Sequence, residues 1–150
     1  MVKSSSASLL LSKFLPYRLS VLSNRISRAI ADGYEEQFQL TLAEWRTMAV
    51  LGEEADLSAG QVAERTAMDK VAVSRAVNKL LDAGRIERRF SSEDKRRSVL
   101  TLSKDGQEIY KTIVPMALNY EESLLKQLSV EEQELLDSLL EKLQNIQLNT

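Results

Sequence analysis

Apolar residues recur at three- and four-residue spacing in several segments of this chain, which is the spacing of one face of a helix. The pattern predicts a helix over about 14–33 that ends at Gly33, and a long helix from Ser103 that Pro115 should bend. Three more helices are marked by capping boxes, in which a Thr or Ser is followed three residues later by Glu or Gln. These boxes begin at Thr41, Ser58 and Ser129.

The middle of the chain predicts a winged helix-turn-helix. A short helix after Ser58 is followed by a three-residue turn and by a helix that Asp69 caps and that ends near Ala83. Residues 85–90 and 97–102 are typical of two short strands with a polar hairpin loop between them. We therefore expect a mainly α-helical fold with a small β-hairpin wing.

Composition narrows the possible functions by exclusion. The chain has no cysteine and no histidine, which removes disulfides, thiol chemistry, imidazole bases and nearly every zinc site. The paired carboxylates are adjacent in sequence and do not converge on one substrate, so we expect neither an enzyme nor a cofactor. No secretory signal is convincing and no apolar run approaches the ~18 residues that span a bilayer, so we expect a soluble cytoplasmic protein.

The net charge of −2 conceals an alternation along the chain. Residues 58–103 carry ten basic and six acidic side chains, a net +4, whereas residues 104–150 carry a net −5. A polyanion responds to charge within about a Debye length, roughly 8–10 Å, rather than to the total. The basic middle segment is thus compatible with a phosphate-binding face, although on charge alone a solvated surface of mixed charge is the more common explanation.

The helix capped by Asp69 should expose a polar face. Short polar and guanidinium side chains near a helix N-terminus reach base edges in the major groove of DNA. On this basis Arg75 is predicted to bind guanine and Asn78 to read adenine, while Ser74 and Lys79 hold phosphate. The predicted contact residues of this helix are Lys70, Val71, Ser74, Arg75, Asn78 and Lys79.

The predicted hairpin adds a group of cations. They are Lys95, Arg96 and Arg97 in and beside the loop, with Arg88 and Arg89 on the neighbouring strand. Cations on a hairpin tip suit insertion into a minor groove, where negative potential is concentrated, and Asp94 should orient one of the arginines. Each feature alone also occurs on solvated helices and on protected sheet edges. Their order along the chain favours DNA binding.

Two consecutive stretches resemble the winged-helix core of MarR-family transcriptional regulators. They are SAGQVAERTAMDKVAVSRAVNKLLDAG, residues 58–84, and RIERRFSSEDKRRSVLTLS, residues 85–103. The run from Asp94 to Ser103 is similar to the family's wing signature, and flanking helices extend the resemblance over about residues 14–146. The resemblance implies a homodimer, with two recognition helices in successive major grooves of a pseudopalindromic operator, acting as a repressor.

The last helix supports a dimer independently, because it is too rich in leucine for the surface of a monomer. The alternative is that these leucines pack only on the chain's own first helix. The expected organisation is an N-terminal tail and first dimerisation helix over 1–33, a DNA-binding lobe over 34–103 and C-terminal dimerisation helices over 104–150.

The resemblance also implies a small effector, since many relatives release DNA when an aromatic or phenolic acid enters a cavity beside the dimerisation helices. Sensing through cysteine or histidine is excluded here by composition. The candidate ligand-binding residues are Tyr17, Arg18, Arg25, Phe38, Trp45 and Met48. Alternatively, Trp45 and Met48 belong to the core, and Arg18 and Arg25 pair with Glu35, Glu36 or acids of a partner chain.

A second interpretation of the whole chain stays open. The winged helix can serve protein contacts without operator specificity, in which case the basic wing is a solvated loop.

Overall fold

The computed structural model describes residues 7–90 and 97–148. The chain divides into two units, Met1–Lys111 and Thr112–Thr150, with the division inside α6 (Lys104–Leu125). Within the described residues, no helix has the length and the apolar character that a membrane span requires.

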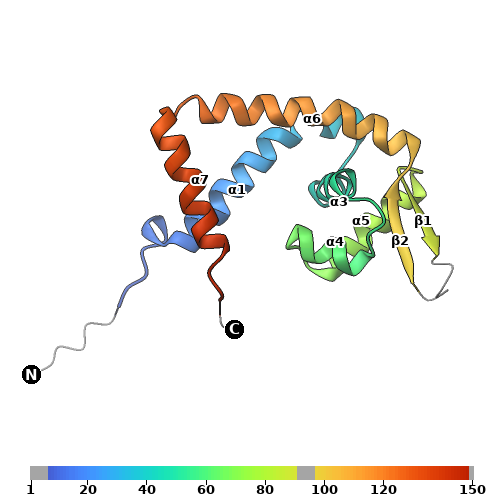
Figure 1. Ribbon diagram of the computed structural model, residues 1–150, viewed down its shortest axis with the longest axis horizontal. Coiled ribbons are helices and arrows are strands. Elements are labelled where there is room, and N and C mark those ends of the chain that lie inside the picture. Colours follow the sequence, from blue (N-terminus) through green and yellow to red (C-terminus); the bar gives the residue numbers. More distant parts are fainter. Residues whose placement is uncertain (1–6, 91–96, 149–150) are drawn as a thin grey trace, which may run out of the picture. The chain divides into compact units, whose positions relative to one another are not determined.

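The first unit is mostly helical and ends in a hairpin that leads into α6. Its elements are η1 (Leu11–Lys13), α1 (Leu15–Ala31), α2 (Glu35–Phe38), α3 (Leu42–Glu53), α4 (Ala59–Thr66), α5 (Lys70–Asp82), β1 (Ile86–Phe90) and β2 (Ser98–Leu102). Figure 1 shows α3, α4 and α5 gathered beside the hairpin. The predicted helices and strands are confirmed to within about two residues, but neither the short α2 nor the single turn η1 was predicted.

Local side-chain chemistry fixes where these helices begin. The Thr41 hydroxyl accepts a hydrogen bond from the Glu44 N–H at 3.2 Å, and the Glu44 carboxylate accepts one from the Thr41 N–H at 2.8 Å. Ser58 and Gln61 form the same reciprocal pair at the start of α4. These bonds satisfy backbone donors that a helix terminus otherwise leaves unpaired, so the predicted capping boxes are confirmed.

The hairpin is antiparallel, with Ile86 opposite Leu102 and Phe90 opposite Ser98. An isolated bridge between Leu57 and Leu100 holds the other edge of β2 against the segment before α4. The apolar core of this unit lies between α3, α4, α5 and the hairpin. Its buried side chains are Tyr34, Leu40, Met48, Leu51, Leu57, Val62, Ala63, Val73, Ala76, Val77, Leu80, Ile86, Leu100 and Leu102.

The second unit contains the end of α6 and α7 (Val130–Gln144). Pro115 lies inside α6, which continues as one helix to Leu125. The predicted capping box of Ser129 and Glu132 begins α7, with bonds of 2.9 and 3.1 Å. No residue of α7 is buried.

Candidate nucleic-acid interface

The turn between α4 and α5 presents α5 to solvent. Ala67 ends α4 in the left-handed region at φ 53°, and the Asp69 carboxylate then accepts a hydrogen bond from the Ala72 N–H at 2.8 Å. Val62 of α4 and Val73 and Val77 of α5 are buried. Packing therefore occupies one face of α5 and leaves the opposite face free.

The free face of α5 carries the predicted contact residues. Its exposed side chains are Lys70, Val71, Ser74, Arg75, Asn78 and Lys79. Within residues 7–90 and 97–148, neither Arg75 nor the two lysines of this face form an ion pair. Their charges are thus available to an external anion.

A groove runs between this face and the start of α3. It has a volume of about 480 Å³ and is lined by Thr41, Ala43, Ala72, Arg75, Ala76, Asn78 and Lys79. Three of its lining residues are alanines, and Arg75 and Lys79 of α5 contribute cations to it. The groove continues the polar face of α5 towards α3.

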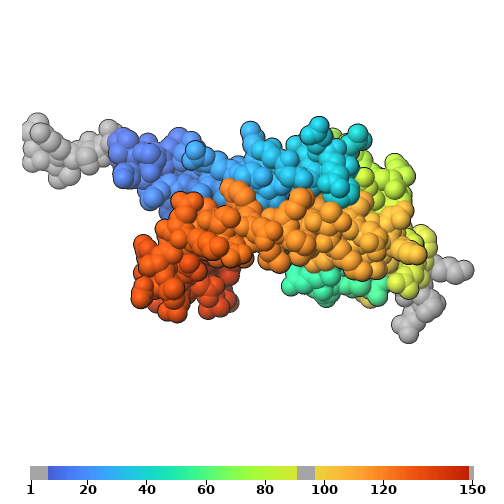
Figure 2. All heavy atoms as spheres, turned by 90° about the horizontal axis from the view of Figure 1, so that it is seen from above, coloured from blue at the N-terminus to red at the C-terminus, as the bar shows by residue number. Residues whose placement is uncertain are grey.

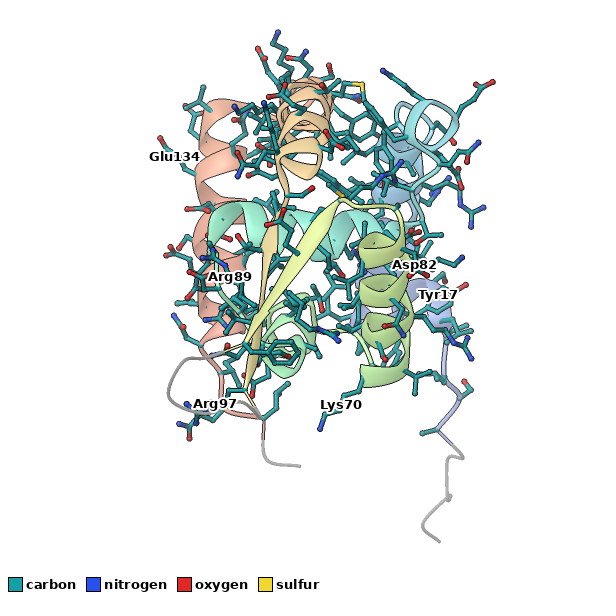
Figure 3. All side chains as sticks on the ribbon, turned by 90° about the vertical axis from the view of Figure 1, so that its right-hand side faces the viewer. Tyr17, Lys70, Asp82, Arg89, Arg97 and Glu134 are labelled. Atoms are coloured by element: carbon teal, nitrogen blue, oxygen red, sulfur yellow. The ribbon has the colours of Figure 1, made fainter. Side chains whose placement is uncertain are left out.

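The described end of the hairpin adds another cation at the same edge of the unit. Arg97 is exposed directly before β2. In Figure 3, Lys70 at the start of α5 and Arg97 lie at one edge, whereas Asp82 lies at the other end of α5. The predicted residues Asp94, Lys95 and Arg96 lie outside the described residues.

The two arginines of β1 are not equivalent. Arg88 lies opposite Leu100 and Arg89 lies opposite Val99, so their side chains leave opposite faces of the hairpin. The Arg89 guanidinium contacts the Asp56 carboxylate at 3.4 Å, and both groups are more than half exposed. Such an exposed pair contributes little to stability, but it partly neutralises Arg89.

The hairpin is anchored at its base by contacts that the sequence pattern did not predict. Arg85 donates to the Phe38 carbonyl oxygen at 2.6 Å, across 47 positions of sequence. The Ser103 hydroxyl donates to the Gly84 carbonyl at 2.6 Å and accepts from the Gly106 N–H at 3.0 Å. A side chain at position 106 would collide with the Arg85 carbonyl oxygen. These contacts fix where the hairpin leaves α5.

The residues predicted to bind an effector are divided between α1 and the segment around α3. Tyr17, Arg18 and Arg25 are exposed on α1, whose surface is visible along its length in Figure 2. Among the described residues, neither arginine forms an ion pair, so the predicted alternative pairing with Glu35 or Glu36 is not observed. Phe38 is half-buried at the end of α2.

Met48 lies in the core of the first unit, and Trp45, which is half-buried, packs at the edge of that core. Met48 is fully buried, and the Trp45 ring lies 5.7 Å from the Tyr34 ring and 6.1 Å from the Tyr110 ring, measured between centroids. This is the arrangement that the core interpretation expects. A ligand role for the six candidate residues stays a prediction.

Tyr34 is a buried residue with a polar group that the sequence pattern did not predict. Its side chain is fully buried, and its hydroxyl has no hydrogen-bond partner among the described residues. Burial, with a smaller contribution from the Glu35 carboxylate, raises the pKa of Tyr34 to about 12. The neutral phenol is therefore strongly favoured in the folded chain.

Comparison with known proteins points to one family. A family model described as MarR family matches residues 38–97. The HTH-type transcriptional regulator BilQ of Clostridium symbiosum is 32% identical over 93 residues, which cover 62% of this chain and 65% of BilQ. The match thus spans just under two thirds of the length of that relative.

Two solved structures have a similar fold. A MarR/EmrR family transcriptional regulator from Acinetobacter sp. ADP1 is 31% identical, with a TM-score of 0.82, and the match covers 91% of this chain and 96% of that one. BpsR of Bordetella bronchiseptica, whose DNA binding is regulated by 6-hydroxynicotinic acid, is 20% identical with a TM-score of 0.80. That match covers 94% of this chain and 100% of BpsR, and at this identity it shows the fold alone.

Proposed function

Because this chain belongs to the MarR family of transcriptional regulators, we propose that it binds a specific duplex DNA sequence and represses transcription from it. The observation that carries this proposal is the exposed polar face of α5, where Arg75 and two lysines have no ion-pair partner among the described residues. A helix with such a face, held by a helix-turn-helix, fits the major groove of B-DNA.

The proposed contacts divide into base recognition and phosphate binding. Arg75 binds the acceptor edge of guanine with two hydrogen bonds, and Asn78 binds adenine. Phosphate contacts, which set position and supply affinity, come from the remaining polar residues of α5 and from the wing. These residues are Lys70, Ser74, Lys79, Lys95, Arg96 and Arg97.

The functional unit that we propose is a homodimer. The leucine face of α7 consists of Leu135, Leu136, Leu139, Leu140 and Leu143, and Ile146 lies two positions after the helix ends; all six side chains are exposed in the single chain. A monomer rarely leaves so continuous an apolar surface in water, and a twofold axis lets one face cover its own copy. Residues 1–33 and 104–150 form the dimerisation region in this proposal, and residues 34–103 form the DNA-binding lobe.

A small aromatic acid is the effector class that we propose. BpsR, which has the same fold, responds to 6-hydroxynicotinic acid. The cations Arg18 and Arg25 on α1 have no ion-pair partner among the described residues and suit a carboxylate. A ligand that favours one dimer arrangement shifts the population away from the DNA-competent arrangement by its differential affinity.

Selection of bound sequences from a random duplex library tests the proposal. At ~150 mM salt, the parent protein should enrich a sequence with two related half-sites, because a symmetric dimer reads each half-site once. Adding a panel of aromatic acids to the selected duplex should identify an acid that weakens binding. Equal binding to random and selected duplexes would instead support the protein-interaction interpretation.

A further inference from the structure

One apolar side chain lies on the otherwise polar face of α5. Among the described residues between positions 34 and 103, the large apolar side chains that are mostly exposed are Val71, at 60%, and Phe90, at 65%. Phe90 borders the part of the hairpin outside the described residues, whereas both neighbouring turns of Val71 are described. The other valines of α5, Val73 and Val77, are buried in the core.

Val71 contributes little to the fold. Its side chain has no place in the core, and a β-branched residue has lower helix propensity than alanine. The Asp69 cap already fixes the start of α5 through its bond to the Ala72 N–H. The stability of the unit therefore gives no reason for a valine at this position.

The position of Val71 places it with the residues proposed to read bases. It is the second residue of α5, and Ser74, Arg75 and Asn78 follow it at three, four and seven positions, on the same helix face. The first turn of a recognition helix lies closest to the base edges. The isopropyl group is thus carried into the groove together with the Arg75 guanidinium.

Thymine is the base that presents an apolar group in the major groove. Its 5-methyl group projects from the base edge, whereas the other three bases present hydrogen-bond donors and acceptors there. We propose that Val71 selects thymine at one position of each half-site by packing against this methyl group. The inference rests on the proposed function, since it needs α5 in a major groove.

Uracil provides the direct test, because it pairs as thymine does and lacks only the methyl group. The probe is the duplex selected by the parent protein from a random library, with each thymine of one half-site replaced by uracil in turn. One replacement should weaken binding of the parent about fourfold, which corresponds to the loss of one buried methyl contact. Val71→Ala should bind the thymine and uracil forms of that duplex equally.

Val130 supplies a matched control. It is a similarly exposed valine, at 67%, in the first turn of α7, another helix capped by a side chain, and it lies on the side of that helix opposite the leucine face, where it takes no part in the proposed dimer contact. Val130→Ala should keep the parent's preference for thymine over uracil. Because both valines are exposed, both variants should keep the parent's melting temperature, which circular dichroism checks.

The outcomes separate the inference from the function on which it rests. If no duplex is enriched, the proposed function fails. If a duplex is enriched but no uracil replacement alters binding, or Val71→Ala keeps the full preference for thymine, then Val71 is an ordinary exposed valine and the inference is overturned.

Discussion

α5 and α7 are both amphipathic helices with a side-chain cap, yet they bury their apolar faces differently. α5 buries four residues, Val73, Ala76, Val77 and Leu80, and presents polar side chains to solvent. α7 buries none and presents its leucine face to solvent. The apolar face of α5 is buried by its own chain, whereas the apolar face of α7 is exposed in the single chain.

The difference indicates which kind of partner each helix lacks. The outward face of α5 carries cations that have no ion-pair partner in the described part of the chain, and a polyanion such as DNA can neutralise them with release of counterions. The outward face of α7 is apolar. Contact of this face with water is unfavourable in free energy, and burial against another apolar surface removes that cost. One subunit thus presents two surfaces of opposite chemistry, and the proposed DNA-binding dimer would cover both of them.

The largest expected effect comes from a charge in the leucine face. Leu139→Glu should raise the dimer dissociation constant at least 100-fold, because each leucine burial is worth about 1.5–3 kcal/mol and twofold symmetry counts the loss twice. Analytical ultracentrifugation measures this constant. Operator affinity should fall with it, since a monomer binds one half-site.

Ser138→Glu is the matched control for that substitution. Ser138 is exposed on α7 and follows Leu135 by three positions, at the edge of the leucine face rather than at its centre, so the same carboxylate there should weaken the dimer far less than Leu139→Glu. If Leu139→Glu and Ser138→Glu give the same sedimentation as the parent, then the leucine face is not a dimer contact. The inference that α7 lacks an apolar partner would then be wrong.

The next effect belongs to the outward face of α5. Arg75→Ala should cost about 1–3 kcal/mol of operator binding and relax the preference at one base pair, while the melting temperature stays that of the parent. Arg75→Lys should retain the salt dependence but not the base preference, because an ammonium lacks the planar fork of guanidinium. Fluorescence anisotropy on operator and single-mismatch duplexes measures both. If Arg75→Ala keeps the base preference of the parent, another residue of α5 must recognise that base.

Much of this contrast could be predicted from the sequence, because its determinants are local. The capping boxes at Thr41, Ser58 and Ser129 join residues three positions apart, and all three were confirmed. Helical periodicity also identified the exposed face of α5. Periodicity alone did not distinguish α5 from α7, since both have an apolar stripe; it was the high leucine content of α7 that predicted an apolar face without a partner in its own chain.

The features that sequence reasoning missed depend on distant partners. Arg85 reaches the Phe38 carbonyl across 47 positions, and Arg89 meets Asp56 across 33. Tyr34 directly precedes the single turn of α2 and is buried. Its ring neighbour Trp45 packs against Tyr110, which is 65 positions away in sequence. A four-residue helix such as α2 carries too short a pattern for periodicity to detect.

Tyr34 offers a test of the packing in the core of the first unit. Tyr34→Phe should raise the free energy of unfolding by about 1 kcal/mol, because it removes a buried hydroxyl without a hydrogen-bond partner. Urea denaturation measures this change. A loss of stability instead would mean that the hydroxyl has a partner, such as water, in solution.

The difference in unfolding free energy between the parent and Tyr34→Phe should also depend on pH. The pKa of Tyr34 is about 12 in the folded chain, against about 10 for an exposed tyrosine, so between these values the unfolded state loses the proton first. Above pH 10 the free energy of unfolding of the parent should therefore fall by roughly 1.4 kcal/mol per pH unit relative to Tyr34→Phe. Below pH 9 the difference between the two proteins should be constant.

The smallest expected effect is that of Arg97, which extends the cationic edge of α5 to the hairpin. As a phosphate contact, it supplies affinity but no base preference, so Arg97→Ala should weaken operator and random duplexes by the same few-fold factor. The slope of log affinity against log salt should become shallower by about one per half-site. Arg97→Lys should restore the slope because it keeps the charge. If Arg97→Ala weakens operator binding alone, Arg97 reads a base, and base recognition extends from α5 to the wing.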